Sequence, residues 1–473
     1  MARLDIRCNV QVPVTLMPVR RWGNSPQQAL TRDMGIYGAF LKAKAPLSLP
    51  VDSLINLKAH LPYAPVETEG RVLRREEAGL AVKFTRLDRR SKSLLWNYIK
   101  EKIPHWERCP FCGAENPPGV DYCGGCGLFI NFHIDNYLEI HEREVISRQS
   151  RRLESALERF NERMEEIERR LLGGEGEEQE LLKEVSSAIY EVCDVCRDLD
   201  EVVGEERESL KEKKLMLRER TERFFSKSYF MRHARSWPRG YPGDYKMLEN
   251  IYRNIPLSDG IGYLLDLHFL NTALAVGVRE RLATLRELLR RELEVRQKPT
   301  ILDVACGPCR EIFELAPEIA QSEARITCVD FDSEALDFAY NRISYTKVAS
   351  QVQFRKYNAL RMVNHEKNLK EFGPQDIIFS TGLFDYLTDD LLVKLIRALY
   401  QLLKPGGKLI CSFKDSTMYK TQEYHWFVDW DSFFQRTAEQ SRSLLTEAGI
   451  EDELIKTTRE RTGVIIFYIV EKP

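Results

Sequence analysis

The sequence predicts a multi-domain protein with a small all-β barrel, a cysteine-rich ribbon, an α-helical hairpin or coiled coil, and a doubly wound, Rossmann-like α/β domain. Three observations lead to this fold class. The chain has 473 residues, about three times the size of one domain. Its apolar pattern changes along the chain from short alternating runs to heptads, and then to alternating strands and helices. Its 11 cysteines are grouped rather than evenly spread.

The composition excludes several classes of protein. Hydrophobic residues make up 43% of the chain and charged residues 30%, with a formal net charge of −2, which excludes wholesale disorder and collagen-like repeats. No apolar run is long enough to cross a bilayer. The start, Met-Ala-Arg-Leu-Asp, lacks the apolar core of a signal peptide. We therefore expect a cytoplasmic protein.

Residues 1–104 are expected to form the barrel. Short alternating stretches separated by Gly, Pro and Asn predict strands at 8–16, 38–41, 53–60, 69–73 and 80–84, followed by a helix at 89–102. Up to residue 108, 19 Lys and Arg stand against 10 Asp and Glu. This excess of nine positive charges indicates affinity for an anion, although a solvated basic face would explain it too.

Residues 105–130 contain two Cys-x-x-Cys-Gly motifs. Ten residues separate the two pairs, which suffices to bring all four thiolates around one tetrahedral Zn²⁺. A redox dithiol would need only one pair. The segment therefore predicts a zinc ribbon whose metal supplies much of its folding energy, with the ligands Cys109, Cys112, Cys123 and Cys126.

Residues 131–222 follow a heptad pattern on both sides of a glycine-rich turn at 173–176. The predicted seam residues are Leu153, Leu157, Phe160, Met164, Ile167, Leu171, Leu182, Val185, Ile189, Val192, Cys196, Leu199 and Val203. An antiparallel hairpin is the simplest interpretation, and a coiled coil in a homodimer is the alternative. Cys193 and Cys196 are expected to be small core residues rather than a second metal site.

Residues 223–297 are expected to be a helical substrate or lid region, and residues 298–473 alternate between strands and helices. Strands are predicted at 299–304, 325–330, 352–355, 376–380, 408–413 and 464–470, with helices at 311–319, 334–343, 389–403 and 433–448. This order predicts a mostly parallel, doubly wound sheet with ligand sites at the carboxyl ends of its strands.

The first of these strands runs into Asp303-Val304-Ala305-Cys306-Gly307-Pro308-Cys309-Arg310. A turn of small residues allows a ligand to approach the backbone, and a following helix offers free N–H groups. The second strand ends at Asp330, whose carboxylate can accept both hydroxyls of a ribose. The pattern predicts a nucleoside site, and the G-x-G-x-x-G of dinucleotide-binding folds is absent.

This segment resembles the class I S-adenosylmethionine (SAM)-dependent methyltransferases, through residues 301–307, 329–330, 357–359, 376–380 and 403–407. The resemblance implies SAM as cofactor, with Asp303 and the turn at its methionine end, Asp330 at the ribose and Asn358 at the adenine edge. Ala305 and Cys309 stand where the family usually has glycines. The cofactor-binding residues implied are Asp303, Ala305, Cys306, Gly307, Asp330, Phe331, Asn358, Ala359 and Thr381.

Residues 237–245, 382–387 and 424–430 make the segment look more specifically like the enzymes that produce 3-hydroxy fatty acid methyl esters. The resemblance implies a fatty-acid-like acceptor methylated on a carboxylate or a hydroxyl. Methylation of a carboxylate needs alignment and exclusion of water rather than a strong base. We expect Arg239 and Tyr241 to contact the acceptor, with His425 as the base for a hydroxyl. Alternatively, these residues only fasten a loop.

The N-terminal segment carries Arg3 and Arg7 four residues apart, followed by Asp33, Gly35 and Gly38. It resembles the PilZ domain, which binds cyclic di-GMP through R-x-x-x-R and D/N-x-S-x-x-G motifs. Forked guanidinium groups can bind phosphate and stack on purines. Gly35 replaces the usual serine and removes one hydroxyl donor, which costs about 1 kcal/mol, roughly fivefold in affinity.

Together these features predict a SAM-dependent, O-directed methyltransferase regulated by cyclic di-GMP. The alternative from another class is a non-catalytic PilZ adaptor whose methyltransferase-like domain binds SAM or nothing. A nucleic-acid methyltransferase is disfavoured by the acidic helical region and by the absence of Asn/Asp-Pro-Pro-Tyr after the fourth strand.

Overall fold

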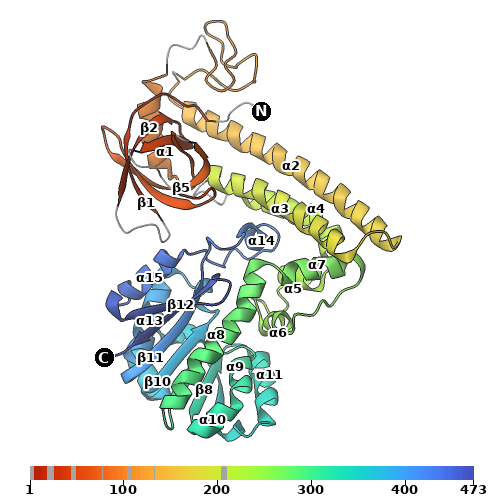
Figure 1. Ribbon diagram of the computed structural model, residues 1–473, viewed down its shortest axis with the longest axis vertical. Coiled ribbons are helices and arrows are strands. Elements are labelled where there is room, and N and C mark those ends of the chain that lie inside the picture. The colour runs from red at the N-terminus through yellow and green to blue at the C-terminus, as the bar shows by residue number, and fades with distance from the viewer. Residues whose placement is uncertain are drawn as a thin grey trace. The chain divides into compact units, whose positions relative to one another are not determined.

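The computed structural model describes the chain except residues 1–4, 19–25, 44–48, 77, 104–107, 133 and 204–209. Its contacts divide into two compact units, whose helices and strands are labelled in Figure 1. Unit 1 contains residues 1–161 and 189–219, and unit 2 contains residues 162–188 and 220–473. This grouping is coarser than the five segments expected from the sequence, whose boundaries stay predictions.

Unit 1 contains a closed six-stranded antiparallel barrel in the order β1-β2-β3-β6-β5-β4. The strands are β1 Pro13–Pro18, β2 Gln27–Met34, β3 Gly38–Ala43, β4 Leu54–His60, β5 Pro65–Glu76 and β6 Gly79–Phe84. The expected all-β barrel is confirmed. The sequence pattern missed β2, because its first two residues, Gln27 and Gln28, are polar and exposed and its Arg32 and Asp33 interrupt the apolar signal.

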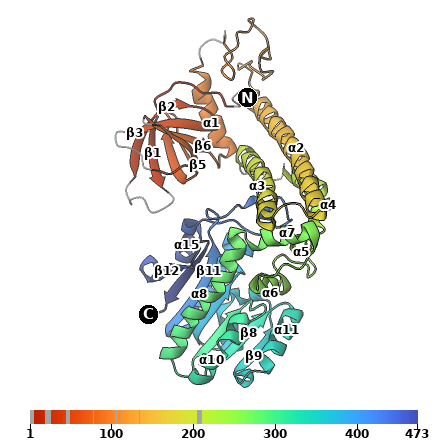
Figure 2. The ribbon, with the colours of Figure 1, turned by 45° about the vertical axis from the view of Figure 1, so that its right-hand side comes forward.

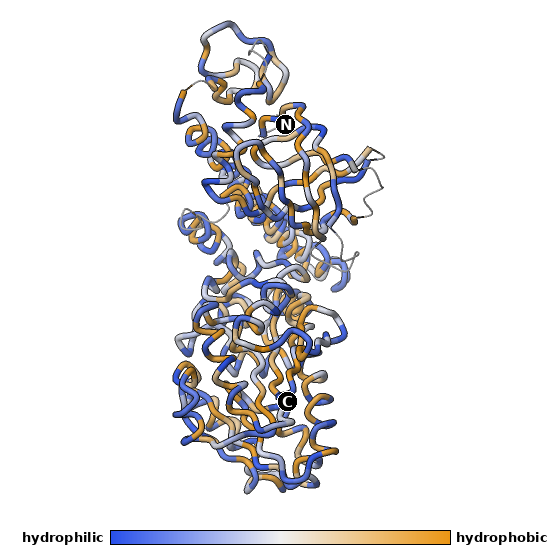
Figure 3. Tube along the Cα trace, turned by 90° about the vertical axis from the view of Figure 1, so that its left-hand side faces the viewer, coloured by the Kyte–Doolittle hydropathy of each residue, from blue (hydrophilic) through white to orange (hydrophobic). Residues whose placement is uncertain are grey.

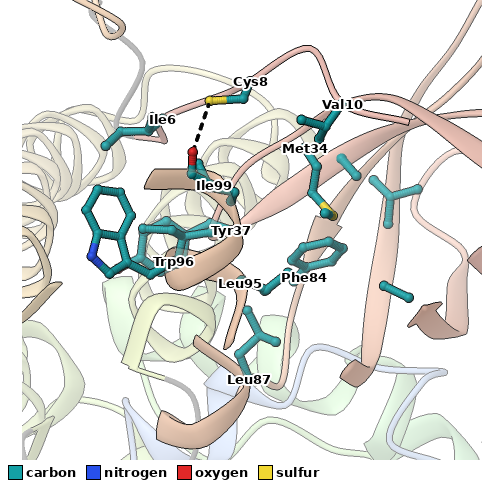
Figure 4. Packing of buried hydrophobic residues seen from close by; sticks show 14 of the residues in the cluster. Ile6, Cys8, Val10, Met34, Tyr37, Phe84, Leu87, Leu95, Trp96 and Ile99 are labelled. Atoms are coloured by element: carbon teal, nitrogen blue, oxygen red, sulfur yellow. Dashed lines mark hydrogen bonds between the residues drawn. The ribbon is translucent and has the colours of Figure 1, made fainter. Parts of the chain in front are cut away.

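The barrel core is closed by helix α1, Arg89–Lys100. The side chains of Leu95, Trp96 and Ile99 on this helix are buried with residues of the barrel (Figure 4). The thiol of Cys8 lies 3.9 Å from the Ile99 carbonyl oxygen. Asp88 caps the helix by accepting the Ser91 N–H, which satisfies one of its unpaired first-turn donors. Helix and barrel therefore share one core.

The two long helices α2, Tyr137–Leu172, and α3, Glu178–Val203, form the expected antiparallel hairpin within one chain. In unit 1 Arg152 pairs with Asp198 at 3.2 Å, and in unit 2 Arg170 pairs with Glu184 at 2.7 Å. The predicted seam residues are buried, except that Leu181 is buried in place of Leu182 and Leu171 is only half-buried. The cysteines at 193 and 196 lie in this apolar core.

Helix α3 is also fastened to the barrel inside unit 1. Lys83 on β6 pairs with Asp198 at 2.8 Å and with Glu201 at 2.7 Å, and Arg71 on β5 pairs with Glu201. The side chains of Arg71 and Glu201 are both nearly buried. Removal of one partner from such a buried pair would leave an uncompensated charge, which costs about 3–5 kcal/mol. The barrel and the end of α3 therefore form one structural element.

Unit 2 begins with helices and continues with the α/β domain. The helices before the sheet are α4 Lys211–Phe225, which starts in unit 1, α5 Tyr229–Ser236, α6 Tyr245–Arg253, α7 Gly260–Leu270 and α8 Ala273–Val295. Among the residues described, no single helix has both the length and the apolarity of a membrane span; α7 and α8 meet these criteria only as a pair bent by 56°.

The α/β domain contains a seven-stranded sheet in the order β12-β13-β11-β10-β7-β8-β9. The strands are β7 Thr300–Val304, β8 Arg325–Asp330, β9 Val352–Lys356, β10 Gln375–Thr381, β11 Leu403–Lys414, β12 Ile455–Arg459 and β13 Ile465–Glu471. Strands β7 to β11 are parallel, and β13 pairs antiparallel with β11 and β12. The predicted doubly wound architecture is confirmed, with β12 as an additional edge strand.

Helices cover this sheet, and α8 crosses one face of it (Figure 2). The helices that follow β7 are α9 Arg310–Glu314, α10 Ala316–Ser322, α11 Ser333–Ser344, α12 His365–Phe372, α13 Asp389–Gln401, α14 Gln422–His425 and α15 Ala438–Glu447. The single helix predicted at 311–319 is divided into α9 and α10 just before Pro317. Hydrophobic stretches lie in the barrel and along the sheet (Figure 3). In the sheet they are expected, because parallel strands are buried on both faces.

Candidate active site and ligand sites

A cavity of about 410 Å³ opens at the carboxyl ends of the parallel strands. Ala305 after β7, Asp330 at the end of β8, Thr381 at the end of β10 and Lys414 at the end of β11 all line it. Its remaining walls are mostly apolar, with contributions from Ile251, Phe269, Val278, Tyr386, Trp430 and Phe433. This size, lining and position are typical of small-molecule sites in open α/β folds.

The turn after β7 forms one wall of the cavity. Ala305, Gly307 and Cys309 all have positive φ angles, of 59°, 52° and 46°. Left-handed backbone costs a residue with a β-carbon about 1–2 kcal/mol, so the two replacements of glycine noted in the sequence fall where glycine would be least strained. The turn nevertheless keeps the left-handed path that brings its backbone close to a ligand.

Asp330 is held in place by this turn. The Gly307 N–H donates to one of its carboxylate oxygens at 2.9 Å, and the Asp332 N–H donates to the other at 3.0 Å. Burial raises the pKa of Asp330 to about 6, despite these two hydrogen bonds, which favour the charged form. Each oxygen keeps a lone pair for a ligand hydroxyl.

Seven of the nine cofactor residues expected from the sequence line the cavity: Ala305, Gly307, Asp330, Phe331, Asn358, Ala359 and Thr381. Asp303 and Cys306 are buried and are not among the lining residues. Burial raises the pKa of Asp303 well above its usual range, and the adjacent Glu311 raises it further. Burial also raises the pKa of Glu311, to about 7.

The loop before α6 lies beside Asp330 and Phe331, at the carboxyl end of β8. Arg239 donates two hydrogen bonds to the carboxylate of Asp332, at 3.1 and 3.3 Å, and also pairs with Glu334. The Tyr241 hydroxyl donates to the same carboxylate at 2.8 Å. Tyr241 lines the cavity and Arg239 does not. These contacts fasten the loop to the start of α11.

A second charged group lines the cavity at the end of β11. The ammonium of Lys414 contacts the carboxylate of Asp385 at 2.5 Å, and their side chains are 8% and 2% exposed. The ammonium also lies 4.6 Å from the centre of the Phe433 ring. Burial lowers the pKa of Lys414, whereas Asp385 acts in the opposite direction.

His425 on α14 is buried and is not among the residues that line the cavity, whereas its neighbour Tyr424 is. The Tyr424 hydroxyl lies 3.3 Å from the hydroxyl of Thr272. The structure therefore brings Tyr241 and Tyr424 to the cavity, and leaves Arg239 and His425 outside its lining. The catalytic roles expected for Arg239, Tyr241 and His425 stay predictions.

The four ribbon cysteines converge in unit 1. Their sulfur atoms all lie within 4.8 Å of one another, with Cys109 3.7 Å from Cys126 and Cys112 3.6 Å from Cys123. Four thiolates at about 2.3 Å from a tetrahedral Zn²⁺ would be separated by roughly 3.8 Å. The cluster therefore fits zinc, and such a site would stabilise a segment that has little apolar core of its own.

The barrel motif residues also come together, except Arg3, which lies outside the described residues. The Arg7 guanidinium donates to the Asp33 carboxylate at 2.9 Å. The Asp5 carboxylate accepts the backbone N–H groups of Ile36 and Tyr37 at 2.8 and 3.1 Å. A β-carbon on Gly35 would lie 2.3 Å from an Asp5 oxygen. The carboxylate of Asp5 thus occupies the space that a serine side chain would need.

Comparisons with known families agree with this architecture. Residues 301–407 match the model described as a methyltransferase domain, and residues 2–101 match the PilZ domain. The chain therefore contains one segment similar to the PilZ domain and one similar to a methyltransferase domain. No curated protein matches the chain.

Several solved structures are similar to this chain. A possible exported protein from Bordetella parapertussis is 23% identical, covers 49% of this chain and 79% of its own, and has a TM-score of 0.41. An O-methyltransferase family protein from Burkholderia thailandensis is 16% identical over 42% of this chain and 59% of its own, with a TM-score of 0.33. Magnesium protoporphyrin IX methyltransferase from Synechocystis is 14% identical, and the match covers 42% of this chain and 82% of that protein, with a TM-score of 0.31. Nothing about the substrate follows from similarities of this degree.

Sequence reasoning missed three charged residues of the cavity region: Arg281, Asp385 and Lys414. Asp385 lies in the 382–387 segment that carried part of the resemblance, and Lys414 directly follows the strand predicted at 408–413, so both had a positional signal. Arg281 had none, because one Arg within the Arg-rich helix α8 is indistinguishable in sequence from its solvent-exposed neighbours.

Proposed function

We propose that the protein is a SAM-dependent methyltransferase that responds to cyclic di-GMP and methylates an oxygen atom of a small, lipid-like acceptor. The observation that carries this proposal is the cavity itself. Its lining combines Asp330 and Asn358, which would bind the nucleoside, with the apolar side chains of Phe269, Val278 and Trp430. A cofactor and an apolar acceptor would therefore meet in one enclosed space.

In this proposal Asp330 accepts the two ribose hydroxyls of SAM, and Asn358 and Ala359 contact the adenine. The left-handed turn at Ala305 and Gly307 brings the backbone against the methionine part of the cofactor. Asp303, which is buried, supports this turn. Thr381, at the end of the central strand β10, then lies where the methyl group would leave the sulfonium.

Chemistry at the acceptor requires alignment more than proton transfer. A carboxylate is already ionised, so a rigid and dry cavity is enough to place its oxygen in line with the methyl group. Tyr241 would contact the ligands directly. Arg239 would act through Asp332, by fastening the loop that carries Tyr241. His425 would need to reach the cavity to serve a hydroxyl acceptor as a base.

The proposed cyclic di-GMP site is the surface around Arg7, Asp33 and Gly38. A β-carbon on Gly38 would lie 3.1 Å from the Arg7 guanidinium, so Gly38 leaves room for that group. Gly38 is the ladder partner of Lys83 on β6, whose ammonium is paired with α3. A ligand that alters this ladder would therefore act on the helix. Regulation requires that cyclic di-GMP bind two arrangements with different affinity, and about 1.4 kcal/mol of difference changes activity tenfold at most.

The proposal is tested by calorimetry with SAM on wild type, Asp330→Ala and Asp337→Ala. Asp337 is an exposed acid on α11, so its variant is a matched control for the loss of one charge. We expect wild type and the control to bind SAM alike and Asp330→Ala to bind at least tenfold more weakly. A non-catalytic adaptor would give no heat with SAM, or no difference between wild type and Asp330→Ala.

Regulation is tested separately, by measuring the transfer of radiolabelled methyl groups to hydroxylated fatty acids with and without cyclic di-GMP. An Arg7→Ala variant should lose the response and keep the basal rate. If saturating cyclic di-GMP changed neither turnover nor SAM affinity in wild type, the regulatory half of the proposal would be wrong.

A further inference from the structure

The cavity contains a buried guanidinium without an ionic partner. Arg281 on α8 lines the cavity and is 3% exposed. Within the part of the chain that the structure describes, its one hydrogen bond is to the Tyr252 hydroxyl, at 3.2 Å, and it makes no ion pair. Lys414, in contrast, forms an ion pair with Asp385.

The backbone is adapted to bring this guanidinium into the cavity. Gly382, directly after β10, has a φ of 110°, and a β-carbon there would lie 3.0 Å from a terminal nitrogen of Arg281. Any side chain at this position would both strain the turn and press on the guanidinium. Arg281 therefore approaches the end of the central strand as closely as the backbone allows.

A buried and unpaired charge is costly, and the usual solution is a partner of opposite charge. Glu311 acts electrostatically on Arg281, but among the residues that the structure describes the two form no ion pair. Burial raises the pKa of Glu311 to about 7, so only part of it is charged near neutral pH. Glu311 therefore compensates the guanidinium only in part, and Arg281 can still pair with an external anion.

The charges that the ligands bring point to the acceptor. Asp385 pairs with Lys414, and SAM brings a sulfonium, an ammonium and a carboxylate, which sum to a net positive charge. The ionised Asp330, which also lines the cavity, can offset that charge, so an uncharged acceptor would leave the guanidinium of Arg281 without an ionic partner in a mostly apolar cavity. A carboxylate would compensate it, and its two oxygens match the planar fork of an arginine.

We propose that Arg281 binds the carboxylate of the methyl acceptor and so determines that the enzyme methylates an apolar carboxylic acid. This inference rests on the proposed methyltransferase function. In the reaction a carboxylate oxygen attacks the methyl carbon, the new O–CH₃ bond forms and the S⁺–CH₃ bond breaks. The bonding electrons neutralise the sulfonium, and no proton is transferred. The products are a neutral methyl ester and S-adenosylhomocysteine.

The same geometry explains how the product would leave. The ester has no charge, so its interaction with Arg281 is weaker than that of the substrate. A guanidinium that binds the acid and not the ester therefore selects the substrate and favours release of the product.

The test uses full-length protein and four probes. Straight-chain carboxylates of 6 to 16 carbons, with decanoate as the reference, and 1-decanol are titrated into protein saturated with S-adenosylhomocysteine. S-adenosylhomocysteine and 5′-methylthioadenosine, which lacks the amino-acid carboxylate, are titrated into unliganded protein. The variants are Arg281→Gln, Arg281→Lys and the control Arg290→Gln, which removes a charge from the same helix at a surface pair with Glu318.

We expect wild type to bind decanoate at least tenfold more tightly than decanol. Arg281→Gln should weaken decanoate at least tenfold, about 1.4 kcal/mol, and leave decanol and S-adenosylhomocysteine within twofold. Arg281→Lys, which keeps the charge, should fall between, and gives the same comparison if the Gln variant is unstable. Arg290→Gln should resemble wild type.

Three results would overturn the inference. The first is a wild type that binds no carboxylate of the series, or binds decanoate no better than decanol. The second is an Arg281→Gln variant that binds decanoate normally. The third is a tenfold loss for S-adenosylhomocysteine without a loss for 5′-methylthioadenosine, because the guanidinium would then serve the carboxylate of the cofactor. Failure of wild type to bind S-adenosylhomocysteine at all would instead refute the proposed function.

Discussion

Cofactor affinity should depend on pH through Asp330. This carboxyl is buried, and its pKa is raised to about 6, whereas the ribose hydroxyls of SAM require the ionised form as acceptor. The apparent dissociation constant is then multiplied by one plus the ratio of protonated to ionised carboxyl. That factor is close to one at pH 8 and about ten at pH 5. Binding of S-adenosylhomocysteine should therefore weaken about tenfold between pH 8 and pH 5.

Stability of the unliganded protein should change in the opposite direction. Because the pKa of Asp330 is raised in the folded state, protonation favours folding, and its contribution is lost as the pH rises from about 4 to about 6. Calorimetry at four pH values measures the affinity, and thermal unfolding at the same pH values measures the stability.

Two variants separate Asp330 from its neighbours. Asp330→Asn should bind the ligand weakly and without the pH dependence. Glu311→Gln removes another carboxyl near the turn whose pKa is raised, and this variant should keep the pH dependence of affinity between pH 5 and 8. A wild type with constant affinity over this range, or an Asp330→Asn variant with the same slope as wild type, would refute the reasoning.

Three further predictions concern other parts of the chain. Gly35→Ser should displace the Asp5 carboxylate and so speed amide hydrogen exchange in β2 and β3. Asp5→Ala added to Gly35→Ser should restore slow exchange. Normal exchange in the Gly35→Ser variant alone would contradict this prediction. Lys414→Met should leave Asp385 buried and unpaired at a cost of about 3–5 kcal/mol, measured by urea unfolding, and Asp385→Leu added to it should recover part of the loss rather than add to it. Cys109→Ser should remove one zinc per chain by elemental analysis and unfold the ribbon, and unchanged zinc content would show that the metal is held elsewhere.

The fold was largely predictable because apolar periodicity reports burial directly. The parallel strands of the α/β domain are short apolar runs, and six of its seven strands were placed from them. The missed strand β12, Ile455–Arg459, is an edge strand of mixed polarity, IKTTR, so it carries little apolar signal. The heptads likewise placed the hairpin, with an error of one position at Leu181.

The site was predictable only in part. Asp330 and the turn at Gly307 follow a strand in sequence, so local pattern located them. Arg281 and Lys414 meet in the cavity from a helix and a strand more than 130 residues apart, and no local spacing shows that. Arg239 was expected at the site because it lies in a glycine-rich loop. Its guanidinium instead pairs with Asp332 and Glu334, and no local pattern in the sequence indicates these two partners.

The chain crosses between its two units three times, after residues 161, 188 and 219, and each crossing falls inside a helix. Neither unit is therefore one continuous segment of the chain. A fragment that begins after the ribbon would contain residues 189–219 but would lack the barrel against which they pack. Excision of either unit at these boundaries would cut α2, α3 and α4. Exchange of unit 1 between chains as one cassette would cut the same three helices.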